Sequence, residues 1–327
     1  MNLELIKELF NNKLKCRKIG EKMEKPKILY KYRDVGEYTE KIFTDKTIWL
    51  SKPENLNDPF ECSIANFTER AKEKMVKKYK VLQVCNFATF GALHMKENKP
   101  YFGLCGKALK SFLKRLGSKS WERRYQMINE VVYENRGTRF SNPNHLVKSL
   151  DERLHETGIF SLSETDTNQL MWAHYAGESR GLAIGFEVTG GSMLADEKHC
   201  IAVNYQDELP EFKADELMSD THMSFGREGA KITVQVPFDD PTFRACVSTK
   251  PTDWAYEKEW RYIDETDGLH PFPGKLVEIT FGLRCSEDDR RKYVKLVQEN
   301  FDYPVHFFEI VKKADTNQIE KREYSIK

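Results

Sequence analysis

The sequence predicts an α+β fold, with a mixed, mostly antiparallel, split β-sheet core and a helical insertion. Short apolar runs typical of strands flank residues 64–157 on both sides, but they do not alternate regularly with helices as in a doubly wound sheet. Residues 64–157 themselves show helical spacing and few strand signals. Hydrophobic residues make up 39% of the 327 residues, which is enough to build a sizeable core.

The N-terminal part is expected to lead from a helix into the first strands of the core. Residues 2–14 place apolar side chains on one helical face, and the charged residues that follow form a linker. The next predicted elements are a strand over 28–32, a helix over 35–43 and a strand over 47–51. The expected division is 1–27 for helix and linker, 28–63 with 158–312 for one core of catalytic type, 64–157 for the insertion and 313–327 for a tail.

The insertion is rich in lysine, glutamate and arginine. Its predicted helices cover residues 68–87, 109–116, 121–136 and 144–156. We interpret the charge runs on them as solvated helix faces rather than as a specific anion site.

The stretch from Ile159 to Val188 organises the core. It predicts a strand over 159–163, a helix over 168–176 capped by Asp166 or Thr167 and ended by Gly177, and a strand over 182–188. On the helix, Trp172 and Tyr175 share one face and His174 lies on the adjacent one. Polar groups beside aromatic rings predict a helix that borders a cavity. The alternative is that His174 and Tyr175 are buried groups with satisfied hydrogen bonds.

The C-terminal part continues with strands and two helices. Strands are predicted over 200–205, 231–238, 254–263, 275–283 and 304–311, and helices over 209–219 and 286–300, with Ser286 as the cap of the second.

Composition narrows the classes of function. The formal net charge of +1 argues against extensive coating of nucleic acid, although a local basic groove remains open. Seven scattered cysteines form no CxxC pair, so neither a zinc ribbon nor a disulfide framework is expected. No metal site, membrane span or signal-peptide core is expected, and we predict a cytoplasmic protein. The sequence contains no P-loop or HExxH motif.

Two early motifs could contact a ligand. Lys31 and Arg33 leave one strand on the same side, which suits a clamp for phosphate or carboxylate, although charged edge residues also protect a sheet from pairing. The Asn57–Glu61 stretch, NDPFE, predicts a structural turn with Phe60 as a plug. Alternatively, Asp58 and Glu61 anchor a basic residue across a site.

A late motif carries two acids. In an extended strand, Glu257 and Glu259 share one face. Two carboxylates at such a short distance raise each other's pKa unless a cation lies between them. Such a pair suits recognition of a ribose diol, stabilisation of a developing cation or general-base work. Trp254, Tyr256 and Trp260 would supply a stacking wall. The alternative is a surface strand paired with a cation from a neighbouring strand.

Together these motifs resemble the bacterial domain-of-unknown-function family 2971. The resemblance rests on LYKYR, NDPFE, SLSE, MWAHYA with GLAIGFEV, and the W-x-x-E-x-E-W-R motif after Lys250, and it runs from about residue 28 to residue 311. Residues 64–157 look like a long form of the variable insertion of that family. The family label implies no activity.

The order of an early arginine, a Ser-x-Ser strand and a late Glu-x-Glu also resembles ADP-ribosyltransferases of the Arg-Ser-Glu type. This resemblance implies that Arg33, with Lys31, holds the phosphate or ribose of NAD, and that Ser161 or Ser163 supports the nicotinamide side. Glu259 would stabilise the oxocarbenium-like transition state, and Glu257 would help to activate the acceptor. The residues expected to flank the nicotinamide are Trp172, His174 and Tyr175, with Trp254 nearby.

Three functions follow as hypotheses. The first is an NAD-using ADP-ribosyltransferase or NAD glycohydrolase, acting as a toxin or phage-defence effector with protein or nucleic acid as acceptor. The second is a sensor without chemistry that grips a nucleotide or another anion through Lys31, Arg33, Lys250 and Arg261. The third is a metal-dependent nuclease built on Asp58, Glu61, Glu257 and Glu259, although position 259 carries Glu where such a motif expects Lys. The oligomeric state is not predicted.

Overall fold

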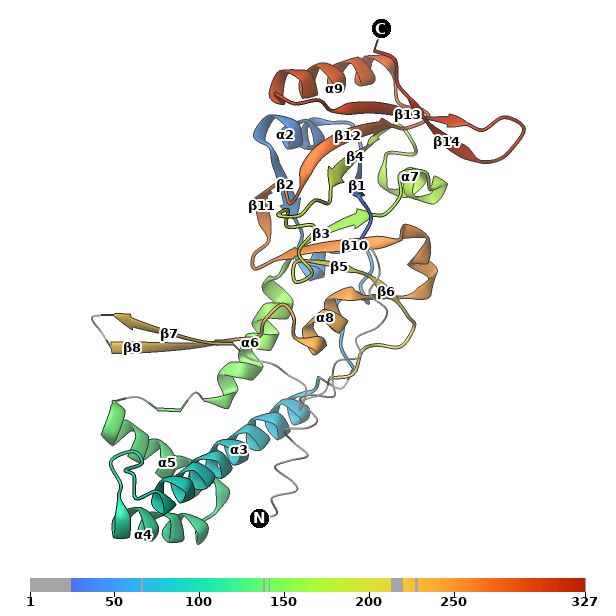
Figure 1. Cartoon of the computed structure of the whole chain (residues 1–327). Helices are drawn as coiled ribbons and strands as arrows, with labels where there is room; N and C mark the ends of the chain where they lie inside the picture. Colours follow the sequence, from blue (N-terminus) through green and yellow to red (C-terminus); the bar gives the residue numbers. More distant parts are fainter. Residues whose placement is uncertain are drawn as a thin grey trace.

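The computed structural model describes residues 25–65, 67–137, 139–140, 142–212, 220–226 and 229–326. The helix predicted over residues 2–14 lies outside this range. An eight-stranded sheet forms the centre of the molecule, in the order β14-β13-β12-β4-β1-β3-β10-β5 (Figure 1). Neighbouring strands are antiparallel except β12 and β13, so the predicted α+β class with a mixed, mostly antiparallel sheet is confirmed.

The strands of the sheet lie close to the predicted ranges, except that the last one falls within residues 313–327, for which a tail was predicted. They are β1 (Ile28–Arg33), β3 (Gly158–Ser163), β4 (Leu182–Glu187), β5 (Cys200–Ala202), β10 (Glu259–Asp264), β12 (Lys275–Phe281), β13 (His306–Lys312) and β14 (Ile319–Glu323). Strands β1 and β3 pair only at Tyr30 and Ser163, so the sheet is weakly joined at this point.

Three strand pairs lie beside the main sheet. They are β2 (Thr47–Leu50) with β11 (Gly268–Pro271), β6 (Asn204–Tyr205) with β9 (Thr249–Lys250), and β7 (Asp220–Gly226) with β8 (Gly229–Gln235).

The two faces of the sheet bury different sets of side chains. On one face, Leu29, Ile184 and Trp260 belong to the largest core, which is covered by α2 (Glu37–Asp45) and α9 (Glu287–Asn300). We call this the α2/α9 face. The opposite face buries Tyr30 and Tyr32 against Trp172 of α7 (Gln169–Tyr175), and Ile159 and Ile263 beside α8 (Pro241–Ser248). We call this the α7 face.

The described residues between 64 and 157 form four α-helices, as their spacing predicted. These are α3 (Glu69–Lys96), α4 (Gly106–Gly117), α5 (Trp121–Arg136) and α6 (Pro143–Glu156). They project from the sheet at the end opposite α9 (Figure 1). Val84, Phe87, Phe112 and Val132 give α3, α4 and α5 a separate apolar core. The chain returns to where it left, because Ser51 and Ile159 exchange two backbone hydrogen bonds of 2.8 Å.

Helix ends follow local side-chain chemistry, with one correction. Ser286 caps α9 as predicted, since its hydroxyl accepts from the Asp289 backbone N–H. The cap of α7 is Asn168 and not Asp166 or Thr167, because its Oδ1 accepts from the backbone N–H groups of Leu170 and Met171.

Two later segments also differ from the prediction. Residues 254–263 are not one strand: they divide into the 3₁₀ helix η2 (Thr252–Glu257) and β10, separated by Lys258 with a left-handed φ of 45°. Residues 209–212 are not helical, since the Pro210 carbonyl accepts from the Ala65 backbone N–H in a bridge to another segment. The rest of that predicted helix, 213–219, lies outside the described residues.

Candidate functional site

Five charged side chains meet on the α7 face of the sheet. They are Glu61, Lys250, Glu257, Glu259 and Arg261, and none is more than 8% exposed. Buried charges persist in proteins only when they are paired and hydrogen-bonded. We call these five residues the charge cluster.

Different elements deliver these side chains to one place. Glu259 and Arg261 are two residues apart on β10, so strand alternation points both toward the α7 face. Glu257 ends η2, and the left-handed Lys258 turns the chain between the two acids. Lys250 comes from β9, and Glu61 from the loop that follows η1 (Pro53–Asn55).

Lys250 lies at the centre of the charge cluster. Its Nζ is 2.6 Å from Glu257 Oε2, 3.0 Å from Glu259 Oε2 and 3.1 Å from Glu61 Oε1. The same ammonium lies 4.9 Å from the centre of the Trp254 ring, which covers it with an aromatic face. Three carboxylates therefore share one cation.

Arg261 is the second cation of the charge cluster. Its Nε donates to Glu259 Oε1 at 2.9 Å, Nη1 donates to the Val247 carbonyl at 2.8 Å, and Nη2 pairs with Glu61. The side chain is fully buried, so these partners replace the water it loses. Counting three acids and two bases, the charge cluster carries one excess formal negative charge.

The two acids of the late motif experience opposite electrostatic effects. Burial raises the pKa of Glu257 above its usual range, against the opposing effect of Lys250. Burial also acts to raise the pKa of Glu259, but the adjacent Arg261 and Lys250 charges outweigh it and hold the pKa at about 2. Glu259 is therefore ionised at neutral pH, whereas Glu257 is the acid that takes up a proton more easily.

This difference predicts a pH dependence of stability. Because the pKa of Glu259 is lower in the folded chain than its ordinary value, its ionisation stabilises the fold above about pH 4.5, and this contribution is lost as the pH falls toward 2. The loss is on the order of 3 kcal/mol. We expect urea unfolding midpoints to fall less steeply between pH 5.5 and pH 2.5 in Glu259→Gln than in the unsubstituted protein. Equal slopes would contradict the assignment.

Several residues predicted from the sequence lie beside the charge cluster. Ser163 donates through its hydroxyl to the Glu257 carbonyl at 2.7 Å, and Ser161 lies opposite Arg261 in the pairing of β3 with β10. Tyr175 donates to Glu257 Oε1 at 2.5 Å. The half-buried Trp254 covers Lys250, so both serines, Tyr175, Trp254 and the two acids come together.

Lys31 and Arg33 lie on the other face of the sheet. They alternate with Tyr30 and Tyr32, and they pair with Ile184 and Leu182 of the α2/α9 core. Lys31 Nζ donates to the Ser161 carbonyl at 2.8 Å and lies 4.8 Å from the Phe160 ring centre. Burial and the nearby Arg33 lower the pKa of Lys31 to about 7. The expected meeting of Arg33 with Glu259 does not occur, and the guanidinium beside Glu259 is that of Arg261.

Helix α7 packs into the core more than it borders a cavity. Trp172 is buried, its indole N–H donates to the Asp166 carbonyl at 2.7 Å, and its ring meets Tyr32 edge to face at 5.0 Å. His174 is exposed, with its ring 6.3 Å from that of Tyr256. Neither residue touches a carboxylate of the charge cluster through a described hydrogen bond.

The NDPFE loop forms a turn and also supplies an acid. The Asp58 carboxylate accepts from the Phe60 backbone N–H at 2.9 Å, as expected for a turn. Phe60 is 70% exposed, so the prediction that it plugs the structure is wrong. Glu61 anchors Lys250 and Arg261, which fits the alternative interpretation for that residue.

Lys250 and Arg261 contribute more to this site than the sequence predicted. The alternation Glu259-Trp260-Arg261 was a usable signal, since it puts an acid and a base on one strand face. No local signal connects Glu61 with either of them, because almost 200 residues separate these segments.

A comparison with known families bears on this region. Residues 171–262 match the model of a family described as "Protein of unknown function (DUF2971)". This segment is similar to the DUF2971 family, and we call residues 171–262 the DUF2971 segment. The predicted family resemblance is thus confirmed for the part of the chain from α7 to β10. The DUF2971 segment contains four of the five residues of the charge cluster, all but Glu61. No curated protein and no solved structure matched the chain.

Two further findings concern the described part of the chain. No group of three or more His, Cys, Asp and Glu side chains there is arranged to hold a metal ion. No helix there is both long and apolar enough to cross a membrane.

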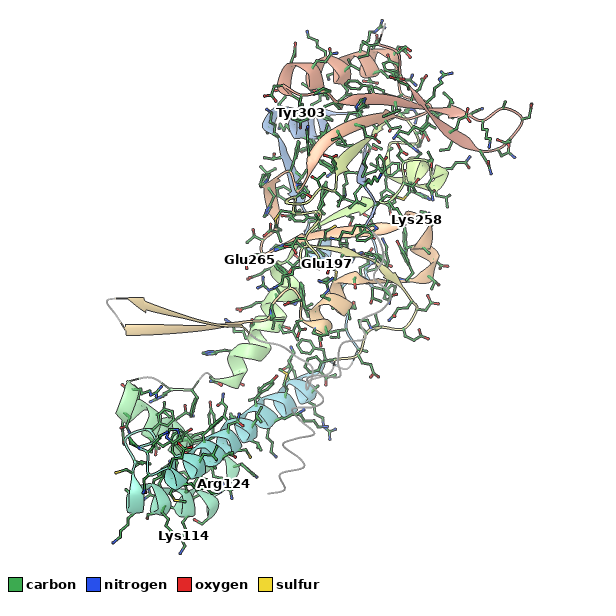
Figure 2. The ribbon with its side chains drawn as sticks, viewed as in Figure 1. Lys114, Arg124, Glu197, Lys258, Glu265 and Tyr303 are labelled. Carbon is green, nitrogen blue, oxygen red and sulfur yellow. The ribbon has the colours of Figure 1, made fainter. Side chains whose placement is uncertain are left out.

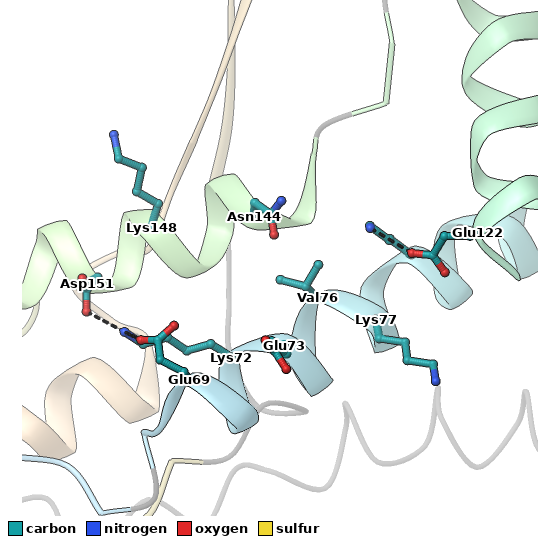
Figure 3. Close-up of a pocket in the computed structure, with 10 residues that line it drawn as sticks. Glu69, Lys72, Glu73, Val76, Lys77, Glu122, Asn144, Lys148 and Asp151 are labelled. Carbon is teal, nitrogen blue, oxygen red and sulfur yellow. Dashed lines mark hydrogen bonds and ion pairs between the residues drawn. The ribbon is translucent and has the colours of Figure 1, made fainter.

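A groove of about 550 Å³ lies away from the charge cluster, between α3 and α6 (Figure 3). Its charges largely pair with one another: Lys72 lies 3.3 Å from Asp151, and Lys80 lies 3.3 Å from Glu122. It contains none of the residues predicted to bind a ligand.

Proposed function

We propose that this protein cleaves the glycosidic bond of NAD or a related nucleotide, as an NAD glycohydrolase or ADP-ribosyltransferase. A role as an intracellular toxin or defence effector would follow. The observation that carries the proposal is the meeting of Glu257 and Glu259 with their pKa values shifted in opposite directions. Paired acids whose environments push their pKa values apart are typical of sites that perform acid–base chemistry on a bond.

The two acids suit the two needs of the reaction. When the bond between nicotinamide nitrogen and ribose C1 breaks, its electron pair leaves with nicotinamide and positive charge develops on the ribose. The ionised Glu259, in a charge cluster with one excess negative charge, would stabilise that cation. Glu257, with its raised pKa, would take the proton of the water or acceptor hydroxyl that bonds to C1.

Aromatic side chains next to Glu257 would bind the planar parts of the nucleotide. Trp254, Tyr175 and Tyr256 are half-buried, and His174 is exposed. The Tyr256 ring centre lies 6.2 Å from that of Trp254 and 6.3 Å from that of His174. Lys31 and Arg33 do not suit the phosphates of NAD, because these residues extend from the opposite face of the sheet.

A non-catalytic nucleotide sensor is the second candidate. It is favoured by the fact that every carboxylate of the charge cluster already pairs with Lys250 or Arg261. The nuclease hypothesis gains no support, because the space between the three acids holds the Lys250 ammonium.

The deciding experiment incubates the full chain with NAD, alone and with cell extract as a source of acceptors, and measures free nicotinamide by chromatography. We expect nicotinamide release that persists in excess chelator. Binding of NAD by calorimetry without release would favour the sensor instead. Release that chelator abolishes would contradict the mechanism above.

A further inference from the structure

The segment between β2 and β3 carries a large net positive charge. Residues 64–157 contain nineteen Lys and Arg against nine Asp and Glu, a net charge of +10. The rest of the chain has thirty-three basic and forty-two acidic residues, a net charge of −9. The near-neutral total therefore hides two oppositely charged parts, and charge asymmetry of this kind is typical of proteins that bind polyanions.

The positive charge is most concentrated around α4. Residues 98–121 contain six Lys and Arg and no Asp or Glu. Helix α4 buries Leu109, Phe112 and Leu116 against its neighbours. Helical spacing then directs Lys107, Lys110 and Lys114 to the opposite, solvent side, where all three are exposed. We call these three residues, together with Arg115 and Lys119, the α4 surface.

The stability of α4 does not explain this arrangement. Lys107 lies in the first turn, where a positive charge opposes the helix dipole and where α4 has no acid. Lys107, Lys110 and Lys114 are three and four residues apart, so neighbouring charges repel. In the described part of the chain none of these three lysines has an acidic partner, in contrast to Lys72 and Lys80 in the groove of Figure 3.

An exposed aromatic residue borders the α4 surface. Trp121 begins α5 two residues after Lys119 and is 39% exposed. The Arg124 guanidinium lies over its ring at 4.4 Å. A cationic helix beside an accessible indole fits a nucleic-acid strand, because lysines bind the phosphates and aromatic rings stack on unpaired bases.

We propose that the α4 surface binds the phosphate backbone of nucleic acid, with a preference for single strands. An anionic membrane fits less well, because the large apolar side chains of α4 face inward and leave no apolar face to insert into lipid. Lys114 and Arg124 lie at the far end of the molecule from Lys258, which follows Glu257 (Figure 2). The proposal therefore concerns a second site and does not depend on the chemistry at the charge cluster.

The test measures binding of a fluorescent 20-nucleotide single strand, and of the matching duplex, by anisotropy over a range of salt concentrations. The variant is Lys107→Ala/Lys110→Ala/Lys114→Ala in the full chain. The control is Lys295→Ala/Lys312→Ala/Lys313→Ala, which removes the same charge from exposed residues of α9, β13 and the turn after it, at the opposite end of the molecule. Circular dichroism checks that both variants fold.

We expect the unsubstituted protein to bind, and the α4 variant to bind about tenfold or more weakly at 100 mM salt. Its negative slope of log K against log salt should become shallower by about 2, which corresponds to three lost phosphate contacts with a single strand. The control should keep both values. Absence of binding at low salt, equal losses in the two variants, or binding to phosphatidylserine vesicles but not to nucleic acid would overturn the proposal. Nicotinamide release should be unchanged in both variants, so the two proposals fail separately.

Discussion

Replacing Glu259 with glutamine is expected to reduce nicotinamide release from NAD by roughly two orders of magnitude or more. Glutamine keeps the size and much of the hydrogen bonding of Glu259 but removes its charge. The acid proposed to stabilise the cation that develops on the ribose then carries no charge. The loss should appear in kcat, with KM little changed, because the charge acts in the transition state.

Glu61 provides a control for structural damage. Like Glu259, it is buried and pairs with both Lys250 and Arg261. Unlike Glu259, it comes from a distant loop and lies outside the DUF2971 segment. Glu61→Gln removes the same charge from the same cluster, so it should disturb folding to a similar extent and activity much less. Thermal unfolding of both variants verifies the first part of this comparison.

The comparison separates a catalytic role from a structural one. Equal losses of activity in the two variants would mean that the charge cluster matters only as a folded unit. An unchanged rate in Glu259→Gln would remove Glu259 from the mechanism. If Glu257→Gln instead has the larger effect, the roles of the two acids must be exchanged.

The elements of this fold could be predicted wherever a local pattern determines them. β1 and β12 have apolar side chains along most of their length, and Ser286 marks the start of α9 by its own chemistry, ahead of the apolar Tyr293, Val294 and Val297. The presence of α3 to α6 followed for the same reason, although α3 runs to Lys96 and the predicted helix ended at residue 87. The break within residues 254–263 was missed because it depends on Lys258 adopting a left-handed conformation, which is uncommon for residues other than glycine.

The candidate site was less predictable, because its geometry depends on pairing between distant strands. Sequence spacing showed that Lys31 and Arg33 share a face, and that Glu259 and Arg261 share a face. Whether the two pairs lie on the same face of the sheet is decided only by the pairing of Tyr30 with Ser163 and of Ser163 with Glu259. That pairing puts the early cations and the late acids on opposite sides.

Replacing Lys250 with methionine is expected to destabilise the protein by about 3–5 kcal/mol at neutral pH. Methionine fills a similar volume, so packing changes little, but the three buried carboxylates lose their shared cation. Glu61 and Glu259 keep Arg261 as a partner, whereas Glu257 loses the one ion pair described for it. The carboxylates raise the pKa of Lys250 despite its burial, which shows that the charged ammonium is favoured in the fold. Urea unfolding, followed by circular dichroism, measures the change.

The size of this effect should depend on pH in a way that simple loss of packing would not. In Lys250→Met the acids can relieve their repulsion only by taking up a proton, and Glu257 is the first expected to do so because burial already raises its pKa. The destabilisation should therefore be smaller at pH 5 than at pH 7.5. Lys258→Met is the matched control, because the Lys258 side chain is 57% exposed and its Nζ lies 3.7 Å from Glu164 Oε1. Loss of this exposed ion pair should change the free energy of unfolding little at either pH. A large effect of Lys250→Met that is the same at both pH values would mean that the ammonium contributes by packing, and the three acids would then not act as one electrostatic unit.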